Sequence, residues 1–348
     1  MSTSREHQLE VKSVVDETHD SKSFVFVIPD TLKESFKYKP GQFLTFKLNV
    51  AGQSLLRCYS MSSAPRLDDF VRVTIKRVEN GRASNWLCDH VKPGSELTVM
   101  EPGGIFTPPD LRGDFLLCAG GSGITPVLSI LRSVLQSGSG KIKLIYANRD
   151  EQSVIFAEQL KQLHSEYPER LQVIHWLDSV QGIPSTQQLT ELVRSVTSAQ
   201  AYICGPGPFM DGMVTALNNA GMDSENIHLE RFVSLSDGEE SQGDNSQETV
   251  PVTSGIESAE LEIELDGEAH KMHCSGSETL LDAAISAGIN APHSCKSGLC
   301  GACMCKLEEG KVSMQKNEAL DQNMLDKSFI LSCQAVPQSE KVRIRFIG

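Results

Sequence analysis

Short apolar runs separated by turn-forming residues characterise the first third of the chain. The runs occupy 24–28, 43–48, 71–78 and 97–100. Segments of this length, rich in β-branched and aromatic residues and bounded by glycine, proline and polar clusters, are typical of strands. The pattern therefore predicts a small antiparallel β-barrel over 1–110.

From residue 114 onward the pattern alternates between strands and helices. Buried strands are expected at 115–119, 142–146, 171–176 and 201–204, and helices at 127–135, 155–164, 186–195 and 208–220. Such alternation builds a doubly wound parallel sheet, in which ligands bind at the carboxyl ends of the strands. We expect an α/β domain of nucleotide-binding type over 111–233.

An acidic stretch separates this region from the last part of the chain. Residues 234–260 include seven Asp and Glu residues and no Lys or Arg, among many Ser, Gly and Gln. A segment of this composition, without apolar periodicity, is extended and self-repelling. We interpret 234–258 as an acidic, flexible linker.

The last part of the chain has the pattern of a small domain with strands and one helix. Residues 261–265 alternate like a half-buried strand, an Asp-Gly turn follows, and 271–274 can return as the partner strand. An apolar helix is expected at 280–287. We therefore expect a separate domain over 259–348.

Charge and apolar content exclude several classes of function. The chain has 45 Asp and Glu against 32 Lys and Arg, a net charge of −13, and the absence of a basic stripe argues against nucleic acid as a partner. The longest apolar stretch, 115–131, is interrupted by glycines, polar residues and Pro126, so no membrane span is predicted. Residues 1–20 are polar and contain no apolar core of an export signal, so we expect a cytoplasmic protein, and a monomer.

Four of the ten cysteines have a spacing that carries chemistry. Cys295, Cys300 and Cys303 follow the pattern C-x4-C-x2-C, and Cys333 lies further along the chain. This is the ligand spacing of a plant-type [2Fe–2S] cluster. A zinc ribbon usually has two C-x2-C pairs and disulfides need an oxidising compartment, so both alternatives are weaker. Cys305 would share a face with Cys303 if a strand follows the loop, but we expect Cys303 to be the ligand.

The order of hairpin, helix, cysteine loop, further strand and last cysteine resembles the β-grasp ferredoxin family over 259–348. The resemblance implies a cluster held by the four cysteines. The other cysteines, apart from Cys204, are expected to be structural: Cys58, Cys88, Cys118, Cys274 and Cys305.

Two short motifs in the barrel region indicate a flavin site. The first contains Arg57, Tyr59 and Ser60 in the pattern R-x-Y-S, and the second starts at Gly81 in the pattern G-x-x-S. Alone, the first could be any strand end and the second any helix cap. In this order they resemble the ferredoxin–NAD(P) reductase family, whose flavin motif is R-x-Y-S-x-x-S followed by G-x-x-S.

The resemblance implies FAD bound by the residues of both motifs. A tyrosine offers a flat face to the isoalloxazine, an arginine neutralises phosphate, a serine approaches the flavin N5 edge, and free N–H groups at a helix start bind pyrophosphate. FMN-containing relatives share R-x-Y-S, so the preference for FAD over FMN rests on 81–84. The implied residues are Arg57, Tyr59, Ser60, Gly81, Ala83 and Ser84.

Glycine-rich turns follow two of the predicted strands, as G-G-S-G-I-T-P at 120–126 and C-G-P at 204–206. Any α/β domain needs such turns, and Cys204 could simply be a small buried residue. The pair resembles the NAD(P)H domain of the same family, which implies that Thr125 and Cys204 border the hydride path. It also implies close approach of the backbone to pyrophosphate at Gly120, Gly121, Gly123, Gly205 and Pro206.

Two further segments bear on the flavin and on the choice of nucleotide. Glu230 and Phe232 resemble the E-x-F ending of bacterial oxygenase reductases, where the acid and the aromatic approach the flavin, although Phe232 could equally be the last core residue of its domain. After the second strand of the sheet, Arg149 could pair with the 2′-phosphate of NADPH, whereas Asp150 and Glu151 would repel it and could accept a hydrogen bond from the ribose of NADH. Acid outnumbers base, so we expect NADH to be preferred and NADPH to be tolerated.

Along nearly its whole length the chain resembles a three-domain FAD/[2Fe–2S] reductase, the electron-transfer component of bacterial multicomponent oxygenases, of the 3-ketosteroid 9α-hydroxylase and phenylacetyl-CoA epoxidase reductase type. The resemblance implies that electrons from NADH pass through FAD to the cluster and then singly to a terminal oxygenase or another iron protein. The alternatives are a hybrid-cluster-protein-type reductase, a flavin or ferric reductase, and a non-enzymatic redox sensor. The sensor is disfavoured because the sequence has no output domain and carries a hydride-donor site.

Overall fold

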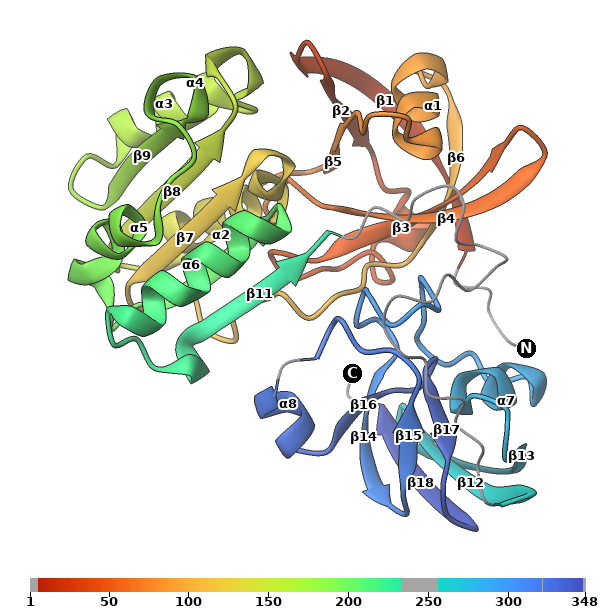
Figure 1. Cartoon of the computed structure of the whole chain (residues 1–348). Coiled ribbons are helices and arrows are strands. Elements are labelled where there is room, and N and C mark those ends of the chain that lie inside the picture. Colours follow the sequence, from red (N-terminus) through yellow and green to blue (C-terminus); the bar gives the residue numbers. More distant parts are fainter. Residues whose placement is uncertain (1–5, 233–255, 321, 347–348) are drawn as a thin grey trace. The chain divides into compact units, whose positions relative to one another are not determined.

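The computed structural model describes residues 6–232, 256–320 and 322–346 (Figure 1). The chain divides into two compact units, a larger one over Gln8–Ser234 and a smaller one that contains Leu235–Gly348. Most of the segment predicted to be a linker, 234–258, lies outside the described residues. Among the described residues, no helix has both the length and the apolar character needed to cross a bilayer.

The first part of the larger unit is a six-stranded antiparallel sheet with the strand order β4-β3-β6-β1-β2-β5. A bridge between Met61, just after β4, and Val73 in β5 joins the two ends of this order, which confirms the predicted barrel. The elements are β1 (Glu6–Thr18), β2 (Ser21–Phe26), a 3-10 turn η1 (Asp30–Leu32), β3 (Phe43–Val50), β4 (Gln53–Ser60), β5 (Val71–Lys76), α1 (Arg82–His90) and β6 (Glu96–Met100).

The sequence pattern missed β1 and β4. In the thirteen residues of β1 only Leu9 and Val11 are buried, so its apolar signal is short. In β4 only Leu55 and Ser60 are buried. Both strands are held mainly by ladder hydrogen bonds to their neighbours, which leave little trace in the order of apolar residues.

The second part of the larger unit is a parallel sheet with the strand order β11-β10-β7-β8-β9, as predicted for a doubly wound domain (Figure 1). Its strands are β7 (Phe115–Gly120), β8 (Ile142–Asn148), β9 (Leu171–Leu177), β10 (Gln200–Gly205) and β11 (Ile227–Arg231). Its helices are α2 (Ile124–Ser137), α3 (Ala157–Glu166), α4 (Asp178–Gln181), α5 (Thr186–Val193) and α6 (Gly207–Asn219), with 3-10 turns η2 (Gly121–Gly123), η3 (Glu151–Ser153), η4 (Arg194–Val196) and η5 (Ser224–Asn226).

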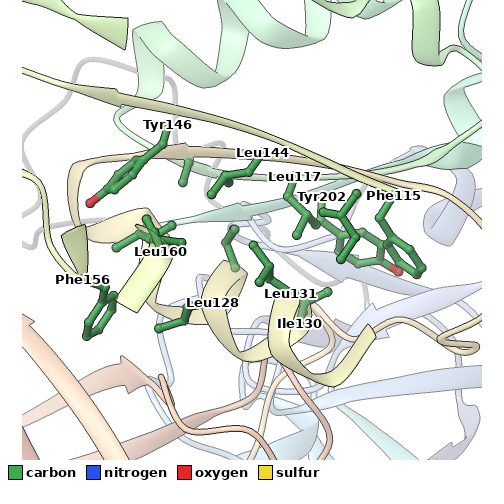
Figure 2. Packing of buried hydrophobic residues seen from close by; sticks show 14 of the residues in the cluster. Phe115, Leu117, Leu128, Ile130, Leu131, Leu144, Tyr146, Phe156, Leu160 and Tyr202 are labelled. Atoms are coloured by element: carbon green, nitrogen blue, oxygen red, sulfur yellow. The ribbon is translucent and has the colours of Figure 1, made fainter. Parts of the chain in front are cut away.

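Both faces of this sheet are buried, which explains why its central strand is apolar throughout. Phe115 and Leu117 of β7 pack in a cluster with α2 and α3 residues such as Leu131 (Figure 2). Leu116 and Cys118 point to the opposite cluster, which contains residues of α5 and α6. A strand buried on both sides reads as a continuous hydrophobic run rather than an alternating one.

The smaller unit has a mixed five-stranded sheet, β13-β12-β18-β14-β16, and a two-stranded sheet, β15-β17, consistent with the predicted β-grasp fold. β12 and β13 form the expected hairpin, whose turn residues Asp266 and Gly267 both have positive φ. The Thr279 side chain caps α7 by accepting from Asp282 N. The elements are β12 (Ser258–Leu265), β13 (Glu268–Ser275), α7 (Leu280–Ser286), β14 (Met304–Glu309), β15 (Val312–Met314), α8 (Gln322–Asp326), β16 (Phe329–Leu331), β17 (Ala335–Pro337) and β18 (Lys341–Phe346).

Candidate active site and metal centre

Three of the residues singled out in the sequence meet inside the larger unit. Ser60 is the last residue of β4 and is 3% exposed, and its Oγ donates a hydrogen bond to Glu230 Oε2 over 3.2 Å. Glu230 lies in β11 directly opposite Cys204 in β10, which is fully buried. The barrel and the α/β sheet therefore contribute side chains to one cluster.

Burial governs the ionisation of this cluster. Burial raises the pKa of Glu230 to about 8, and the hydrogen bond from Ser60 opposes that rise. Burial, and then the charge of Glu230, raise the pKa of the Cys204 thiol well above its ordinary value. The thiol is therefore neutral, whereas Glu230 can both hold and release a proton near physiological pH.

The aromatic and basic residues of the first motif lie on the same strand as Ser60. The Tyr59 ring meets Phe46 edge to face, with centroids 5.6 Å apart and planes at 68°. Burial raises the pKa of Tyr59, so its phenol is neutral. Arg57 is half-buried, and its Nη1 donates to Leu56 O over 2.9 Å.

The last serine of the first motif has a role in joining the two halves of the larger unit. Ser63 Oγ hydrogen-bonds to Tyr38 Oη over 2.8 Å and accepts from Arg72 N over 2.9 Å. Its carbonyl oxygen accepts from Ser129 Oγ in α2 over 2.6 Å. Ser63 thus ties the barrel to the α/β sheet just beyond Ser60.

The second motif begins a helix whose first N–H groups are suited to phosphate. α1 starts after Gly81, and no side chain caps it. Ser84 Oγ instead accepts from Val78 N over 3.1 Å, which fixes the loop before the helix, and Ala83 is buried beneath it. Free N–H groups at the first turn of a helix bind pyrophosphate, so these residues fit FAD.

We predict that Tyr59→Ala weakens flavin retention, because it removes the ring next to Phe46 that is assigned to the isoalloxazine. Ser60→Ala should retain the flavin but slow its reduction by NADH, because it removes the hydroxyl that donates to Glu230. Flavin content after gel filtration and stopped-flow reduction measure the two effects. Tyr59→Phe, which keeps the ring, is the matched control. Wild-type flavin content and reduction rate in both Ala variants would contradict the assignment.

The two glycine turns pack directly against each other at the carboxyl ends of β7 and β10. A Cβ at Gly123 would lie 2.1 Å from Cys204 O, and one at Gly205 would lie 2.9 Å from the Cα of Gly120. Thr125 is buried, and its Oγ1 donates to Ser122 O over 3.0 Å, closing the first turn. Only glycine allows these backbones to approach so closely.

Gly123→Ala is predicted to lower both the melting temperature and the affinity for NADH. The new methyl would overlap the Cys204 carbonyl, and overpacking of this kind costs about 1–3 kcal/mol or more. Gly207→Ala is the matched control, because a Cβ at Gly207 meets nothing within 4 Å. Thermal melts and NADH titrations compare the two. Equal behaviour of the two variants would show that the turns do not depend on this contact.

The residues expected to select the nucleotide are already engaged. Arg149, which follows β8, donates from Nη2 to Asp20 Oδ2 over 3.1 Å. Asp150 caps η3, accepting from Ser153 N over 2.9 Å and from Ser153 Oγ over 2.8 Å. Lys76 Nζ lies 3.7 Å from the same Asp20 oxygen. Sequence reasoning missed Asp20 and Lys76, since no local motif marks them.

Phe232 follows β11 and is 42% exposed. The alternative that it is the last core residue of the domain is therefore wrong. Its neighbour Arg231 forms an ion pair of 2.6 Å with Asp211 in α6. Phe232 is available at the surface beyond Glu230.

The four predicted cluster cysteines form two thiol pairs in the smaller unit. A hydrogen bond with Cys300 and burial raise the pKa of Cys295. A hydrogen bond between Cys303 and Cys333 raises the pKa of Cys303 and lowers that of Cys333. Crowded, enclosed thiols of this kind ionise together only when a metal compensates their charge.

The chain around these pairs is shaped by specific contacts. Ser332 donates from its N and its Oγ to Cys303 O over 3.1 and 3.0 Å, which holds Cys333 beside the loop. Gly298 has φ +76°, and a Cβ there would lie 2.8 Å from Lys316 O, so the loop requires glycine. Ser297 N donates to Cys295 Sγ over 3.4 Å. The enclosed Ser297 Oγ has no hydrogen-bond partner among the described residues and can donate to a cluster sulfide.

The paired arrangement fits a [2Fe–2S] cluster better than zinc. Across the described parts of the chain, no three His, Cys, Asp or Glu side chains are grouped so that they could hold one metal ion. Two pairs of thiols can instead supply two ligands to each of two irons. Cys305 lies in β14, opposite Phe346 and Ile330, and belongs to neither pair.

Models of three protein families match successive parts of the sequence. The oxidoreductase FAD-binding domain matches residues 8–107, the oxidoreductase NAD-binding domain matches 117–215, and the 2Fe-2S iron-sulfur cluster binding domain matches 263–338. The fold and the site therefore define an NAD(P)H-dependent oxidoreductase that carries FAD and a [2Fe–2S] cluster.

Whole-length relatives narrow this class. The chain is 47% identical to the ferredoxin reductase component of 3-ketosteroid-9-alpha-monooxygenase from Rhodococcus rhodochrous, over 99% of this chain and 97% of the relative. It is 35% identical to a 1,2-phenylacetyl-CoA epoxidase component from Escherichia coli strain K12, over 98% of this chain and 97% of that relative. The chain belongs to the family of reductase components of oxygenases that these proteins represent.

A solved structure shows the same overall fold. Phthalate dioxygenase reductase superposes with a TM-score of 0.58 at 22% identity, over 98% of both chains. It is described as a modular structure for electron transfer from pyridine nucleotides to [2Fe-2S]. At this identity the likeness supports the architecture alone.

Proposed function

We propose that the protein oxidises NADH and delivers the electrons singly to the oxygenase component of a 3-ketosteroid-9α-monooxygenase-like system. The similarity to the Rhodococcus rhodochrous reductase component over nearly the full length of both chains supports this acceptor. The observation that carries the proposal is the meeting of Ser60, Cys204 and Glu230, on a chain that also holds two thiol pairs.

The residues of the larger unit bind the two nucleotides and manage one proton. When bound, FAD accepts hydride from NADH and releases electrons one at a time. Arg57 and the N-terminus of α1 hold the FAD phosphates, and Tyr59 holds the isoalloxazine. The turns at 120–126 and 204–206 hold the NADH pyrophosphate.

Ser60 and Glu230 form the proton path. The hydroxyl of Ser60 donates to Glu230 Oε2, so a proton can move between Ser60 Oγ and the carboxyl. Because the pKa of Glu230 is raised to about 8, the carboxyl can serve as donor or acceptor near neutral pH. Thr125 and the neutral Cys204 thiol border the nicotinamide, and Phe232 lies beyond Glu230 to cover the flavin.

In the smaller unit, Cys295 and Cys300 hold one iron and Cys303 and Cys333 hold the other. We place the boundaries of the three domains at 1–110, 111–233 and 259–348, with 234–258 as a linker. The ten unpaired cysteines fit a reducing compartment, so we place the protein in the cytoplasm, and as a monomer.

NADH is the proposed hydride donor. Asp150 and Glu151 follow β8, where acidic side chains accept hydrogen bonds from the ribose hydroxyls of NADH and repel the extra phosphate of NADPH. Arg149, the cation expected to attract that phosphate, is paired with a carboxylate. NADPH is therefore expected to react with a higher KM.

The purified protein tests the proposal. We expect about one FAD and two irons per chain, and rapid NADH-dependent reduction of the oxygenase component of a 3-ketosteroid 9α-monooxygenase. Ferricyanide, cytochrome c and free flavin, assayed in parallel, separate this activity from that of a flavin or ferric reductase. Zinc in place of iron, or turnover with free flavin that exceeds turnover with every protein acceptor, would overturn the proposal.

A further inference from the structure

The carboxylate of Asp20 lies between two parts of the larger unit that are distant in sequence. Asp20 is in the turn between β1 and β2, and its side chain is 16% exposed. Its Oδ1 accepts from Thr18 Oγ1 over 2.8 Å and from Ser21 Oγ over 3.1 Å. These hydroxyls belong to the same turn and fix the direction of the carboxylate.

The other oxygen of Asp20 faces cations. Arg149 Nη2 lies 3.1 Å from Oδ2, and Lys76 Nζ lies 3.7 Å from it. His19 Nε2 is 3.8 Å from the same oxygen. Although burial opposes it, hydrogen bonds from Thr18 and Ser21 and the charge of Lys76 lower the pKa of Asp20, so the carboxylate is ionised.

Both main partners of Asp20 lie where the sheet receives a nucleotide. Arg149 follows β8, and Lys76 ends β5 with its Nζ 3.8 Å from the position of a Cβ on Gly121. Gly121 itself follows β7. In doubly wound sheets, ligands bind outside the carboxyl ends of such strands, next to the turn that holds pyrophosphate.

We propose that Asp20, a barrel residue, determines nucleotide specificity by neutralising Arg149 and Lys76 at the adenosine end of the NADH site. This inference rests on the proposed function and adds a residue to it. A 2′-phosphate carries a charge of about −1.5 to −2 at pH 7, and here it would have to displace or approach a fixed carboxylate. The hydroxyl of NADH meets no such repulsion.

Asp20 suits this role better than the acids next to Arg149. The carboxylate of Asp150 accepts two hydrogen bonds from Ser153 and so turns toward its own loop. The Asp20 carboxylate instead bridges the barrel to the cations of the site. Arg149 is 66% exposed and can rotate toward a phosphate once its partner is removed.

Asp20→Asn tests the proposal, because it removes the charge and keeps the shape. Isothermal titration of 2′,5′-ADP and of 5′-AMP into the holoprotein needs no turnover. We expect the affinity for 2′,5′-ADP to rise about tenfold, as for loss of one like charge, while that for 5′-AMP is unchanged. The kcat/KM for NADPH relative to NADH should rise in parallel.

The partner residue gives a second, independent readout. Arg149→Gln should change 2′,5′-ADP binding little in the wild type but remove the gain in the Asp20→Asn background. Asp16→Asn is the matched control, because Asp16 pairs with Lys22 on the exposed part of β1. If Asp20→Asn is not folded, Asp20→Ser, which keeps a hydroxyl for Thr18 and Ser21, takes its place.

Unchanged discrimination between 2′,5′-ADP and 5′-AMP in the Asp20 variant would overturn the proposal, as would an equal gain for both. A gain that survives Arg149→Gln would overturn the role of Arg149. Failure of NADH to reduce the wild-type flavin would instead overturn the proposed function, and that result is separate from the binding data.

Discussion

Cys333→Ser is expected to abolish the iron–sulfur absorbance and electron transfer to cytochrome c, while NADH still reduces the flavin at the wild-type rate. Cys333 forms one of the two thiol pairs with Cys303, so its loss leaves one iron with a single cysteine. Loss of an outer-shell partner already costs about 10–100-fold in metal affinity, and loss of a ligand should exceed that. Iron analysis, visible spectra and stopped-flow flavin reduction measure the three quantities.

The larger unit explains why flavin reduction should survive. Its two main cores are built from barrel and α/β residues within Gln8–Ser234. Cys274→Ser is the matched control, because Cys274 is buried in the smaller unit and donates only to the Ser275 and Glu278 carbonyls, which a serine hydroxyl can also reach. Loss of flavin reduction in Cys333→Ser, or loss of the cluster in Cys274→Ser, would contradict the assignment.

Glu230→Gln is expected to flatten the dependence of stability on pH and to slow flavin reduction. An ordinary glutamate pKa is 4.5, and burial raises that of Glu230 to about 8. Between these values the folded protein holds a proton that the unfolded chain has released. The free energy of unfolding of the wild type should therefore fall as pH rises from about 4.5 to 8, by on the order of a few kcal/mol, and stay low above pH 8.

Glutamine cannot ionise, so the variant should lose this slope and melt at a higher temperature than the wild type at pH 9. The same substitution removes the proton acceptor of Ser60, and reduction by NADH should slow by about 100-fold if the carboxyl acts in proton transfer. Glu225→Gln, an exposed carboxyl in η5, is the control for loss of a charge. Parallel melting curves for the wild type and Glu230→Gln across pH 5–9 would show that Glu230 is not buried in solution.

Much of the site was predictable because its signals are local. The spacing of Cys295, Cys300 and Cys303 indicates one loop, and the glycine turns at 120–126 and 204–206 must follow strands in any doubly wound sheet. The Asp-Gly turn of the C-terminal hairpin is equally local. In each case a few neighbouring residues restrict the backbone enough to define the structure.

Other elements could not be predicted in this way. β1, β4 and β11 bury few side chains, and their place is set by hydrogen bonds to strands elsewhere in the chain. The prediction that Phe232 could be a core residue failed as an alternative because exposure at a sheet edge depends on what covers the edge.

The sequence by itself determined the barrel, the parallel sheet, the cluster ligands and the two nucleotide turns, since each depends on periodicity or spacing within a short segment. Only the tertiary structure decided which thiols pair, that Ser60 meets Glu230 across 170 positions, and that Asp20 meets Arg149 across 129. Contacts between such distant residues depend on how strands are ordered in a sheet and on how the barrel packs against its neighbour. No local pattern records them, because the residues on either side of each partner are free to vary while the contact is kept.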